Sequence, residues 1–324
     1  MGSGNMILPL PFLTQYILKD VEMVTTLNRA RKRRQHNAGF WLYLLPAIVF
    51  FGAFKYWPFI YSTILSFAKW NFVSDISWVG FKNYASMFNK TMFIRGVTNT
   101  LKYIVFQLPG FVIFPLLFSV LLLNVRSKKL QSIYKSLFFI PTILALSICC
   151  YVWLWMYSTT YGLFNNILGK FGISNVSWLT DKKVAFWSII LVCGWKYLGQ
   201  NLILFMAGML NISQDCIEAA GIDGANGWQT FWRIKMPLLW PTTVYVLITS
   251  VIFAADRSFT AINILTAGGP NYTTTNLAYV IYEFAFKNYN IGIASSIAVF
   301  TSLFFLVITV IMMKTLGGFG YNEE

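Results

Sequence analysis

Residues 291–315 read IGIASSIAVFTSLFFLVITVIMMKT, a predominantly apolar stretch in which Lys314 is the only charged side chain. A hydrocarbon core about 30 Å thick is crossed by roughly 20 apolar residues in α-helical form, so this stretch is long enough to span a bilayer. Five further stretches of the same character precede it. The six predicted spans cover residues 40–67, 100–124, 134–157, 184–210, 238–262 and 291–315.

The composition of the 324-residue chain agrees with membrane insertion. Apolar residues make up 57% of the chain and charged residues 11%, and the mean hydropathy is +0.60. Soluble domains are about 25% charged, and a chain this poor in charge cannot cover a water-facing surface. Because irregular backbone cannot face lipid and no segment alternates like a barrel strand, we predict an all-α integral membrane protein with six transmembrane helices.

Positive charge predicts the orientation of the spans. The net charge is +14, which in a soluble protein would suggest nucleic acid, but here the basic residues concentrate at two places beside spans. They are Arg29, Arg31, Lys32, Arg33 and Arg34 before the first span, and Arg126, Lys128, Lys129 and Lys135 in the second connection. Since cytoplasmic loops retain Lys and Arg, we expect both termini and the second and fourth connections in the cytoplasm, and no nucleic-acid partner.

The chain divides into a tail over residues 1–39, a membrane domain over 40–316 and a short tail over 317–324. Within the first tail, residues 13–30 form either an amphipathic helix at the membrane surface or a mobile segment, and the sequence leaves both open. Three of the four cysteines lie in apolar runs and the fourth in a predicted cytoplasmic loop, so all are expected to be reduced. With one histidine, His36, and no paired His/Cys spacing, we expect no metal site.

The connection between the fourth and fifth spans, residues 211–237, reads NISQDCIEAAGIDGANGWQTFWRIKMP and is far longer than an ordinary inter-helix loop. Ser213 can cap a helix whose first turns contain Asp215 and Glu218, where the helix dipole favours acids. Gly224 is expected to end that helix, and a second short helix is expected before Pro237. A small-residue helix with an acidic start can enter a cleft in a partner protein; a re-entrant or interfacial connector is the alternative.

This loop resembles the EAA loop of bacterial ABC-importer permeases. The matching residues are Glu218-Ala219-Ala220, Asp223-Gly224-Ala225, Phe231, Ile234 and Pro237. A second match, Leu265-Thr266-Ala267-Gly268-Gly269-Pro270, resembles the LTxGGP ending of carbohydrate permeases of the maltose and glycerol-phosphate type. Ser213 departs from the proline that these permeases usually have. With the six spans, the resemblance covers residues 40–315.

The resemblance implies a type I ABC-importer permease fold in the bacterial inner membrane, with the loop as a coupling helix on a separate ATPase. The coupling residues would be Glu218, Ala219, Ala220, Gly221, Asp223, Gly224 and Ala225. The implied partners are a second, homologous permease subunit, two ATPase subunits that bind ATP and Mg, and an extracytoplasmic solute-binding protein. The chain itself has no G-x-x-x-x-G-K-[ST] motif, so we expect it to be non-catalytic and without a cofactor of its own.

Ionisable side chains inside predicted spans are candidates for a substrate pathway, because they are costly in lipid and usually face a cavity or a partner. Lys55 is expected to extend to the outer interface instead. In the fourth span, Gln200 follows Lys196 by one helical turn, and Asn201 follows Tyr197 by the same spacing. The predicted pathway residues are Lys196, Tyr197, Gln200, Asn201, Asp256, Arg257 and Ser258.

A purely structural pairing of Asp256 with Lys196 or Arg257 is the alternative interpretation of these charges. Alignment with the maltose-type permeases implies that Lys196, Tyr197, Gln200 and Ser258, with Arg257 beside it, lie at or next to sugar-contacting positions. Two cations in place of neutral groups suit a carboxylated glycan, since guanidinium pairs well with carboxylate. We therefore predict an importer of alginate or another oligo-uronate.

Two other classes stay open at this point. An ion-coupled secondary transporter would use Asp256 to take a proton or sodium ion, but inverted repeats and broken helices in both halves are expected for that class and neither is clear. A membrane-embedded enzyme would need clustered acids or a metal-binding motif, and Asp256 is essentially the only intramembrane acid.

Overall fold

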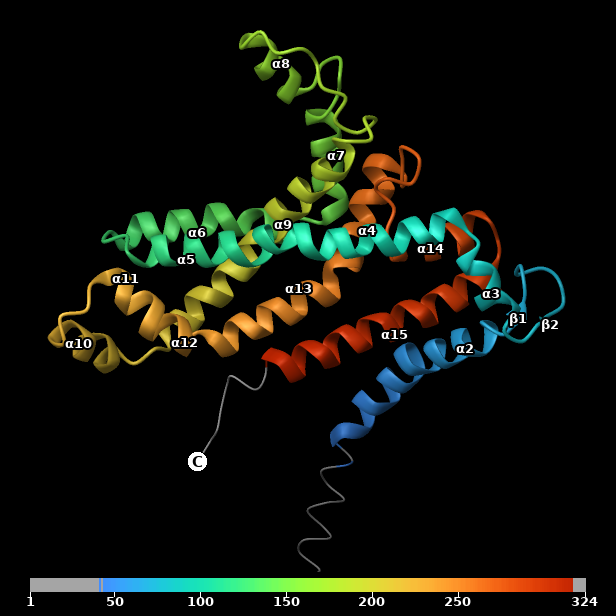
Figure 1. Cartoon of the computed structure of the whole chain (residues 1–324), viewed down its shortest axis with the longest axis horizontal. Coiled ribbons are helices and arrows are strands. Elements are labelled where there is room, and N and C mark those ends of the chain that lie inside the picture. The colour runs from blue at the N-terminus through green and yellow to red at the C-terminus, as the bar shows by residue number, and fades with distance from the viewer. Residues whose placement is uncertain (1–40, 42, 317–324) are drawn as a thin grey trace, which may run out of the picture. The chain divides into compact units, whose positions relative to one another are not determined.

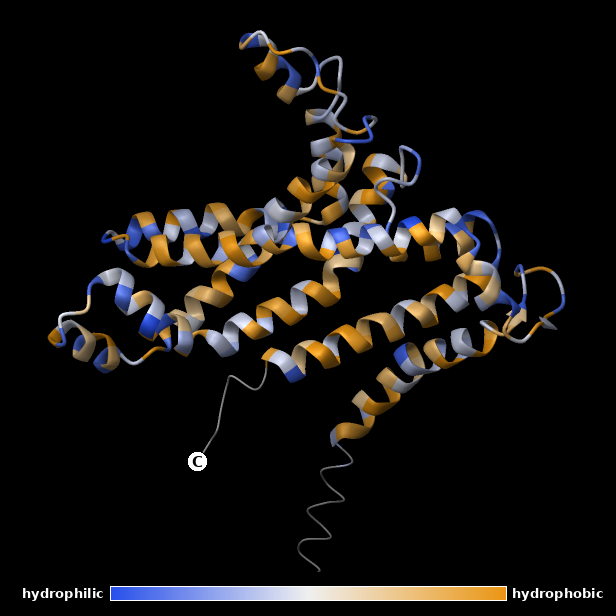
Figure 2. Cartoon of the chain, in the orientation of Figure 1, coloured by the Kyte–Doolittle hydropathy of each residue, from blue (hydrophilic) through white to orange (hydrophobic). Residues whose placement is uncertain are grey.

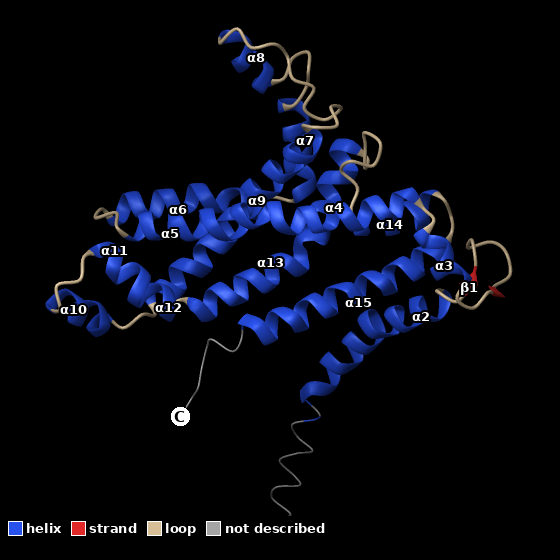
Figure 3. Cartoon of the chain, in the orientation of Figure 1, coloured by secondary structure: helices blue, strands red, loops and turns tan. Residues whose placement is uncertain are grey.

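The computed structural model describes residue 41 and residues 43–316, which are mostly helical (Figures 1 and 3). The chain separates into two compact units, Met1–Tyr61 and Ser62–Glu324. The predicted tails over residues 1–39 and 317–324, including the possible amphipathic helix, lie outside the described residues. In the first unit, the π-helical turn η1 (Gly52–Tyr56) carries Lys55, which is exposed and lies 6.0 Å from the centre of the Phe51 ring.

Five helices of the described chain are long and apolar enough to cross a membrane. They are Tyr43–Leu65, Thr91–Leu123, Ala185–Leu210, Trp240–Thr266 and Ile291–Leu316. A sixth span exists if Lys128–Ile143 and Leu146–Met156, which meet at an angle of 98°, are counted together. The first, second, fourth, fifth and sixth predicted spans therefore match single helices, whereas the third is broken where Leu144 and Ala145 adopt extended backbone angles.

The elements of the second unit are joined by connections of differing length, of which 171–184 and 267–276 are among the longest. In chain order they are the end of α2 (Trp57–Leu65), β1 (Ala68–Lys69), β2 (Ser77–Trp78), α3 (Lys82–Phe88), α4 (Thr91–Leu108), η2 (Pro109–Ile113), α5 (Phe114–Leu123), α6 (Lys128–Ile143), α7 (Leu146–Met156), α8 (Leu163–Lys170), α9 (Ala185–Leu210), α10 (Gln214–Ile222), α11 (Gly227–Thr230), η3 (Phe231–Lys235), α12 (Met236–Leu238), α13 (Trp240–Ala261), η4 (Ile262–Thr266), α14 (Leu277–Tyr282), η5 (Glu283–Lys287) and α15 (Ile291–Leu316). The two strands pair antiparallel, with Ala68 opposite Trp78.

Helix α9 forms the centre of this unit. It packs against α4 and α5, against both arms of the broken pair, α6 and α7, and against α13. Ile189, Val192 and Phe205 on α9 are completely buried. A side chain at Gly199 would collide with the backbone of Phe138, so α6 and α9 approach closely through a small residue, as membrane helices commonly do.

Hydrophobic residues predominate along the long helices (Figure 2), and many of their side chains are exposed. On α15, for example, Leu303, Leu306 and Val310 are exposed. Exposed apolar surface of this extent suits contact with lipid or with another membrane subunit.

Candidate functional site

Helix α10 in the loop between α9 and α13 is closed by local hydrogen bonds. Ser213 occupies the N-cap position, as predicted, although its side chain makes no capping hydrogen bond. The helix ends at Ile222. Gly224 then adopts a left-handed conformation with φ of +75°, and the N–H of Ala225 donates to the carbonyl of Ala220 over 2.9 Å. This is the Schellman arrangement that favours glycine, and it explains why the helix stops where the sequence predicted.

The predicted coupling residues lie on a free surface of the second unit. Glu218, Ala219, Gly221, Asp223 and Gly224 are exposed, Ala225 is half-buried and Ala220 is buried. The neighbouring Ile222 is apolar and 87% exposed. Nothing lies within 4 Å of a Cβ built on Gly221, so the backbone of α10 is open to close approach by another protein.

The rest of the loop leads from α10 to the start of α13. Asn226 and Gln229 cap α11 reciprocally, with each side chain 2.9 Å from the other residue's backbone nitrogen. Of the two aromatic residues whose placement the sequence left open, Phe231 is half-buried against the core and Trp232 is exposed. A hollow of about 320 Å³ follows, lined by Trp232, Met236, Pro237 and Trp240.

Lys196 lies in the helical core at the break between α6 and α7. Its side chain is buried, with 4% exposed, and its Nζ donates to the carbonyl oxygen of Thr142 over 2.6 Å. The Thr142 hydroxyl donates in return to the Lys196 carbonyl over 3.1 Å. The last carbonyls of a helix lack intrahelical partners, and a cation there is favourable. Lys196 thus stabilises the end of α6.

Arg257 on α13 is surrounded by aromatic rings. Its guanidinium carbon lies 4.6 Å from the ring centre of Tyr197, 4.9 Å from that of Phe253 and 5.6 Å from that of Phe111. These distances are those of cation–π contacts. The residues Arg257, Tyr197, Phe253 and Phe111 are called the arginine cage below.

No carboxylate forms an ion pair with Arg257 within the described residues. The ion pair Lys287–Glu283 is the only one found in residues 41 and 43–316, and Asp256 is exposed on α13. The structural pairing of Asp256 with Lys196 or Arg257 is therefore not formed. Arg257 is half-buried and retains its hydrogen-bonding capacity for an anion.

The remaining predicted pathway residues divide between exposed and structural positions. Gln200 is exposed. Asn201 is buried, and its Nδ2 donates to the Phe111 carbonyl over 2.6 Å, which compensates for Pro115, because a proline four residues on has no N–H to offer. Ser258 is completely buried; it donates to the Ala254 carbonyl and accepts from Gln107 Nε2, each over 2.7 Å.

Sequence reasoning missed three residues of this region: Gln107, Phe111 and Phe253. Each stands in an otherwise apolar span, where a lone amide or aromatic residue predicts only helix packing. One usable signal was the i, i+4 spacing of Gln107 and Phe111, which places both on one helical face.

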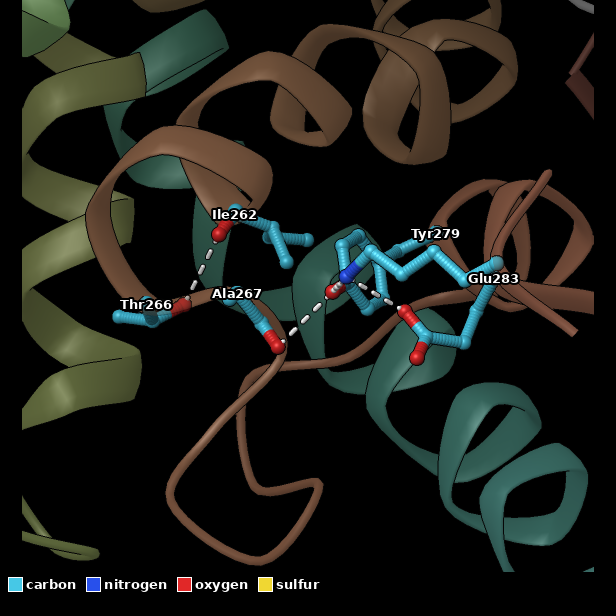
Figure 4. Close-up of polar contacts among 6 residues, drawn as sticks. Ile262, Thr266, Ala267, Tyr279 and Glu283 are labelled. Carbon is cyan, nitrogen blue, oxygen red and sulfur yellow. Dashed lines mark hydrogen bonds and ion pairs between the residues drawn. The ribbon is translucent and has the colours of Figure 1, made fainter.

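The LTxGGP match covers the end of η4 and the tight turn that follows it (Figure 4). Ala267 and Gly268 have positive φ values, and a Cβ on Gly268 would lie 2.6 Å from the Tyr279 ring, so glycine is required. The Tyr279 hydroxyl donates to the Ala267 carbonyl over 2.9 Å, and Lys287 Nζ donates to Tyr279 Oη over 2.8 Å. Lys287 also pairs with Glu283 over 2.8 Å.

The hydrogen bonds around this turn favour the charged form of Lys287. The hydrogen bond to the Glu283 carboxylate, with a second one to the Tyr279 hydroxyl, raises the pKa of Lys287 above its ordinary value. Burial raises the pKa of the Tyr279 hydroxyl as well. Lys287 is therefore charged and Tyr279 neutral at physiological pH, which matches the donors and acceptors of the network.

Among the described residues, no group of three or more His, Cys, Asp or Glu side chains is placed to hold a metal ion. Cys149, Cys150 and Cys193 are buried as free thiols, and Cys216 on α10 is exposed. The described residues thus form a helical scaffold of membrane-spanning length with an exposed loop helix and a half-buried arginine cage, an arrangement that suits a transport permease.

The chain belongs to the family of binding-protein-dependent transport system inner membrane components, whose model matches residues 84–316. It is 30% identical to the arabinooligosaccharides transport system permease protein AraP of Bacillus subtilis, over 86% of this chain and 88% of that protein. It is 28% identical to the sn-glycerol-3-phosphate transport system permease protein UgpA of Brucella suis, over 84% and 92% of the two chains.

The structure is similar to a chain of a bacterial ABC transporter involved in the import of the acidic polysaccharide alginate. The TM-score is 0.77 at 25% sequence identity, with 89% of this chain and 98% of that chain covered. The predicted type I ABC-importer permease fold and the inner-membrane location are thereby confirmed.

Proposed function

We propose that this chain is one membrane subunit of an ATP-driven oligosaccharide importer. It would pair with a second, homologous permease subunit, take its substrate from an extracytoplasmic binding protein and bind two ATPase subunits. Relatives named for arabinooligosaccharides and for alginate support the substrate class. The family, which depends on a binding protein, gives no support to an ion-coupled secondary transporter.

The observation that carries the proposal is the exposed helix α10. Its EAA residues present small side chains and open backbone, and Ile222 adds an exposed apolar contact. We assign this surface to a groove of an ATPase subunit on the cytoplasmic side, where ATP and Mg would be bound. Movement at α10 would pass through α11, η3 and α12 to α13, which carries Arg257.

The arginine cage supports an acidic substrate. A guanidinium with no carboxylate partner, held in an apolar surround, gains from an anionic ligand because a half-buried cation is poorly solvated. A uronate supplies that carboxylate, whereas a neutral sugar does not. We infer that Arg257 binds a carboxylate of an alginate-like oligosaccharide during translocation, with Tyr197, Gln200 and Asp256 on the same pathway.

The test is uptake into proteoliposomes by the complete complex purified from its host. Labelled alginate trisaccharide, arabinotriose and maltotriose are supplied with the binding protein, with and without ATP inside. The proposal expects ATP-dependent uptake with preference for the uronate. ATP-dependent uptake of arabinotriose or maltotriose alone would refute the acidic substrate, and absence of ATP-dependent uptake of any of them would refute the function.

A further inference from the structure

One face of α4 is lined by four buried polar side chains, and three of them serve a common structural purpose. Asn99 donates to the carbonyl of Tyr272 and Tyr103 to that of Thr274, each over 2.9 Å. The hydroxyl of Thr100 accepts from the backbone N–H of Leu277 over 3.0 Å. These three hydrogen bonds hold residues 272–277, which follow the LTxGGP turn, against α4.

Gln107, the fourth residue of this face, has a different environment. It is 1% exposed, and its Nε2 donates to Ser258 Oγ on α13 over 2.7 Å. Because the Ser258 hydroxyl already donates its proton to the Ala254 carbonyl, it can only accept from Gln107, and this fixes the orientation of the amide. The carbonyl oxygen Oε1 of Gln107 is then buried without a hydrogen-bond partner.

An unpartnered buried acceptor is unfavourable and rare, and it needs an explanation. The position of Gln107 offers one. Phe111, one turn on along α4 and η2, lies against the Arg257 guanidinium, and Ser258 directly follows Arg257. The free acceptor therefore belongs to the same junction of α4, η2 and α13 as the arginine cage.

We propose that Gln107 is a substrate-binding residue whose carbonyl oxygen accepts a hydrogen bond from a carbohydrate hydroxyl. This inference rests on the proposed function. A uronate carries hydroxyl donors and a carboxylate on one ring, so it complements the free acceptor of Gln107 and the cation of Arg257 together. Since Gln107 is buried in the present conformation, the contact forms when α13 moves relative to α4 during transport.

The experiment compares Gln107→Leu with wild type in the complete reconstituted complex, at saturating binding protein so that the membrane subunits limit the rate. The probe is whichever of alginate trisaccharide, arabinotriose and maltotriose the wild-type complex imports fastest, together with its set of monodeoxy analogues. One analogue is expected to be imported about fivefold to tenfold more slowly than the parent by wild type, the effect of one net hydrogen bond. Gln107→Leu should slow the parent by that factor and leave that analogue unchanged.

Two further variants keep the test decisive. Gln107→Met preserves length without polar atoms, and it should repeat the result if Gln107→Leu assembles poorly. Asn99→Leu is the matched control on the same face of α4: it removes a donor to a backbone carbonyl, so it should lower the yield of complex while leaving the parent-to-analogue ratio at the wild-type value.

Equal slowing of the parent and every analogue by Gln107→Leu would overturn the inference, because Gln107 would then only hold Ser258 or a buried water. Unchanged discrimination in the variant would overturn it too. Both outcomes leave import by the wild-type complex intact, whereas absence of ATP-dependent carbohydrate uptake by wild type would instead defeat the proposed function.

Discussion

The loop over residues 211–237 and the junction around the arginine cage are held together in opposite ways. In the loop, the bonds join near neighbours, as between Ala225 and Ala220 or between Asn226 and Gln229. At the junction they join distant helices, as from Gln107 to Ser258, which are 151 residues apart. The loop is held mainly by local hydrogen bonds and is largely exposed, whereas the junction exists only when the spans pack. A contact at the loop and a contact at the junction are therefore expected to respond differently to mutation.

The largest effect is expected from Glu218→Lys, which changes the exposed loop and leaves the arginine cage intact. A positive charge on the exposed face of α10 alters the surface assigned to the ATPase, so ATP-driven uptake should fall more than about tenfold, as expected for a charge reversal at a protein contact. ATP hydrolysis by the complex should continue, and membrane insertion should be normal. Uptake and hydrolysis are measured on the same proteoliposomes.

The control for that variant is Asp215→Lys, on the first turn of the same helix and also exposed. It makes the same charge change outside the EAA match and should retain most uptake. Normal uptake by Glu218→Lys would remove the coupling role, and equal loss in both variants would show a nonspecific charge effect.

Arg257→Ala removes the cation of the arginine cage and leaves the loop intact. Loss of one guanidinium–carboxylate contact should slow import of alginate trisaccharide about tenfold relative to neutral trisaccharides. Lys196→Met is the contrasting variant, because the Lys196 ammonium group already donates a hydrogen bond to the Thr142 carbonyl. It should reduce folded complex and slow acidic and neutral substrates alike. Competition uptake assays decide, and equal loss for both substrates in Arg257→Ala would reject the carboxylate role.

Two glycine substitutions sharpen the comparison within the loop. Gly224→Ala places a side chain at φ of +75° and should destabilise the complex by about 1 kcal/mol. Gly221→Ala adds a methyl group in open space within a helix and should stabilise the isolated chain by up to about 1 kcal/mol. Thermal unfolding in detergent gives both values. If α10 is seated closely on an ATPase, Gly221→Ala lowers uptake although stability rises; unchanged uptake would argue against close backbone approach.

The smallest effect is expected from Lys287→Met at the turn beside η4. The ion pair is partly exposed, so its loss should cost at most about 1 kcal/mol, a shift of about 2 °C in Tm. The pKa of Lys287 is raised in the folded state, so its stabilising contribution is complete below the ordinary lysine pKa and is lost only as pH rises through the folded value. The Tm difference from wild type should be constant between pH 6 and 9; a difference that changes in this range would contradict the assignment.

The features that were predicted well, the spans and the end of α10, depend on residues close together in the sequence. Spans follow from length and hydropathy, and the end of α10 follows from Gly224. The break at residues 144–145 was not predicted, because an apolar run continues through it and the carbonyl at the end of α6 is satisfied by Lys196, a residue 54 positions away.

The candidate site was predictable in part for the same reason. Arg257 and Lys196 stood out as charges in apolar spans, but the sequence could not show that one is held by aromatic rings and the other by a helix end. Phe111 contributes to the cage only through the packing of η2 on α13, whereas Phe253 lies one turn before Arg257 on the same helix. Gln107 was recognisable only once its free carbonyl oxygen was seen.

The most direct test of the account is ATP-dependent sugar uptake by the complete complex and by the same preparation from which the ATPase subunits have been removed. We expect uptake of labelled oligosaccharide only when ATPase, internal ATP and binding protein are all present, and restoration when purified ATPase is added back. Uptake by this chain without nucleotide or partner would contradict the claim that its exposed loop couples transport to ATP hydrolysis by a separate subunit.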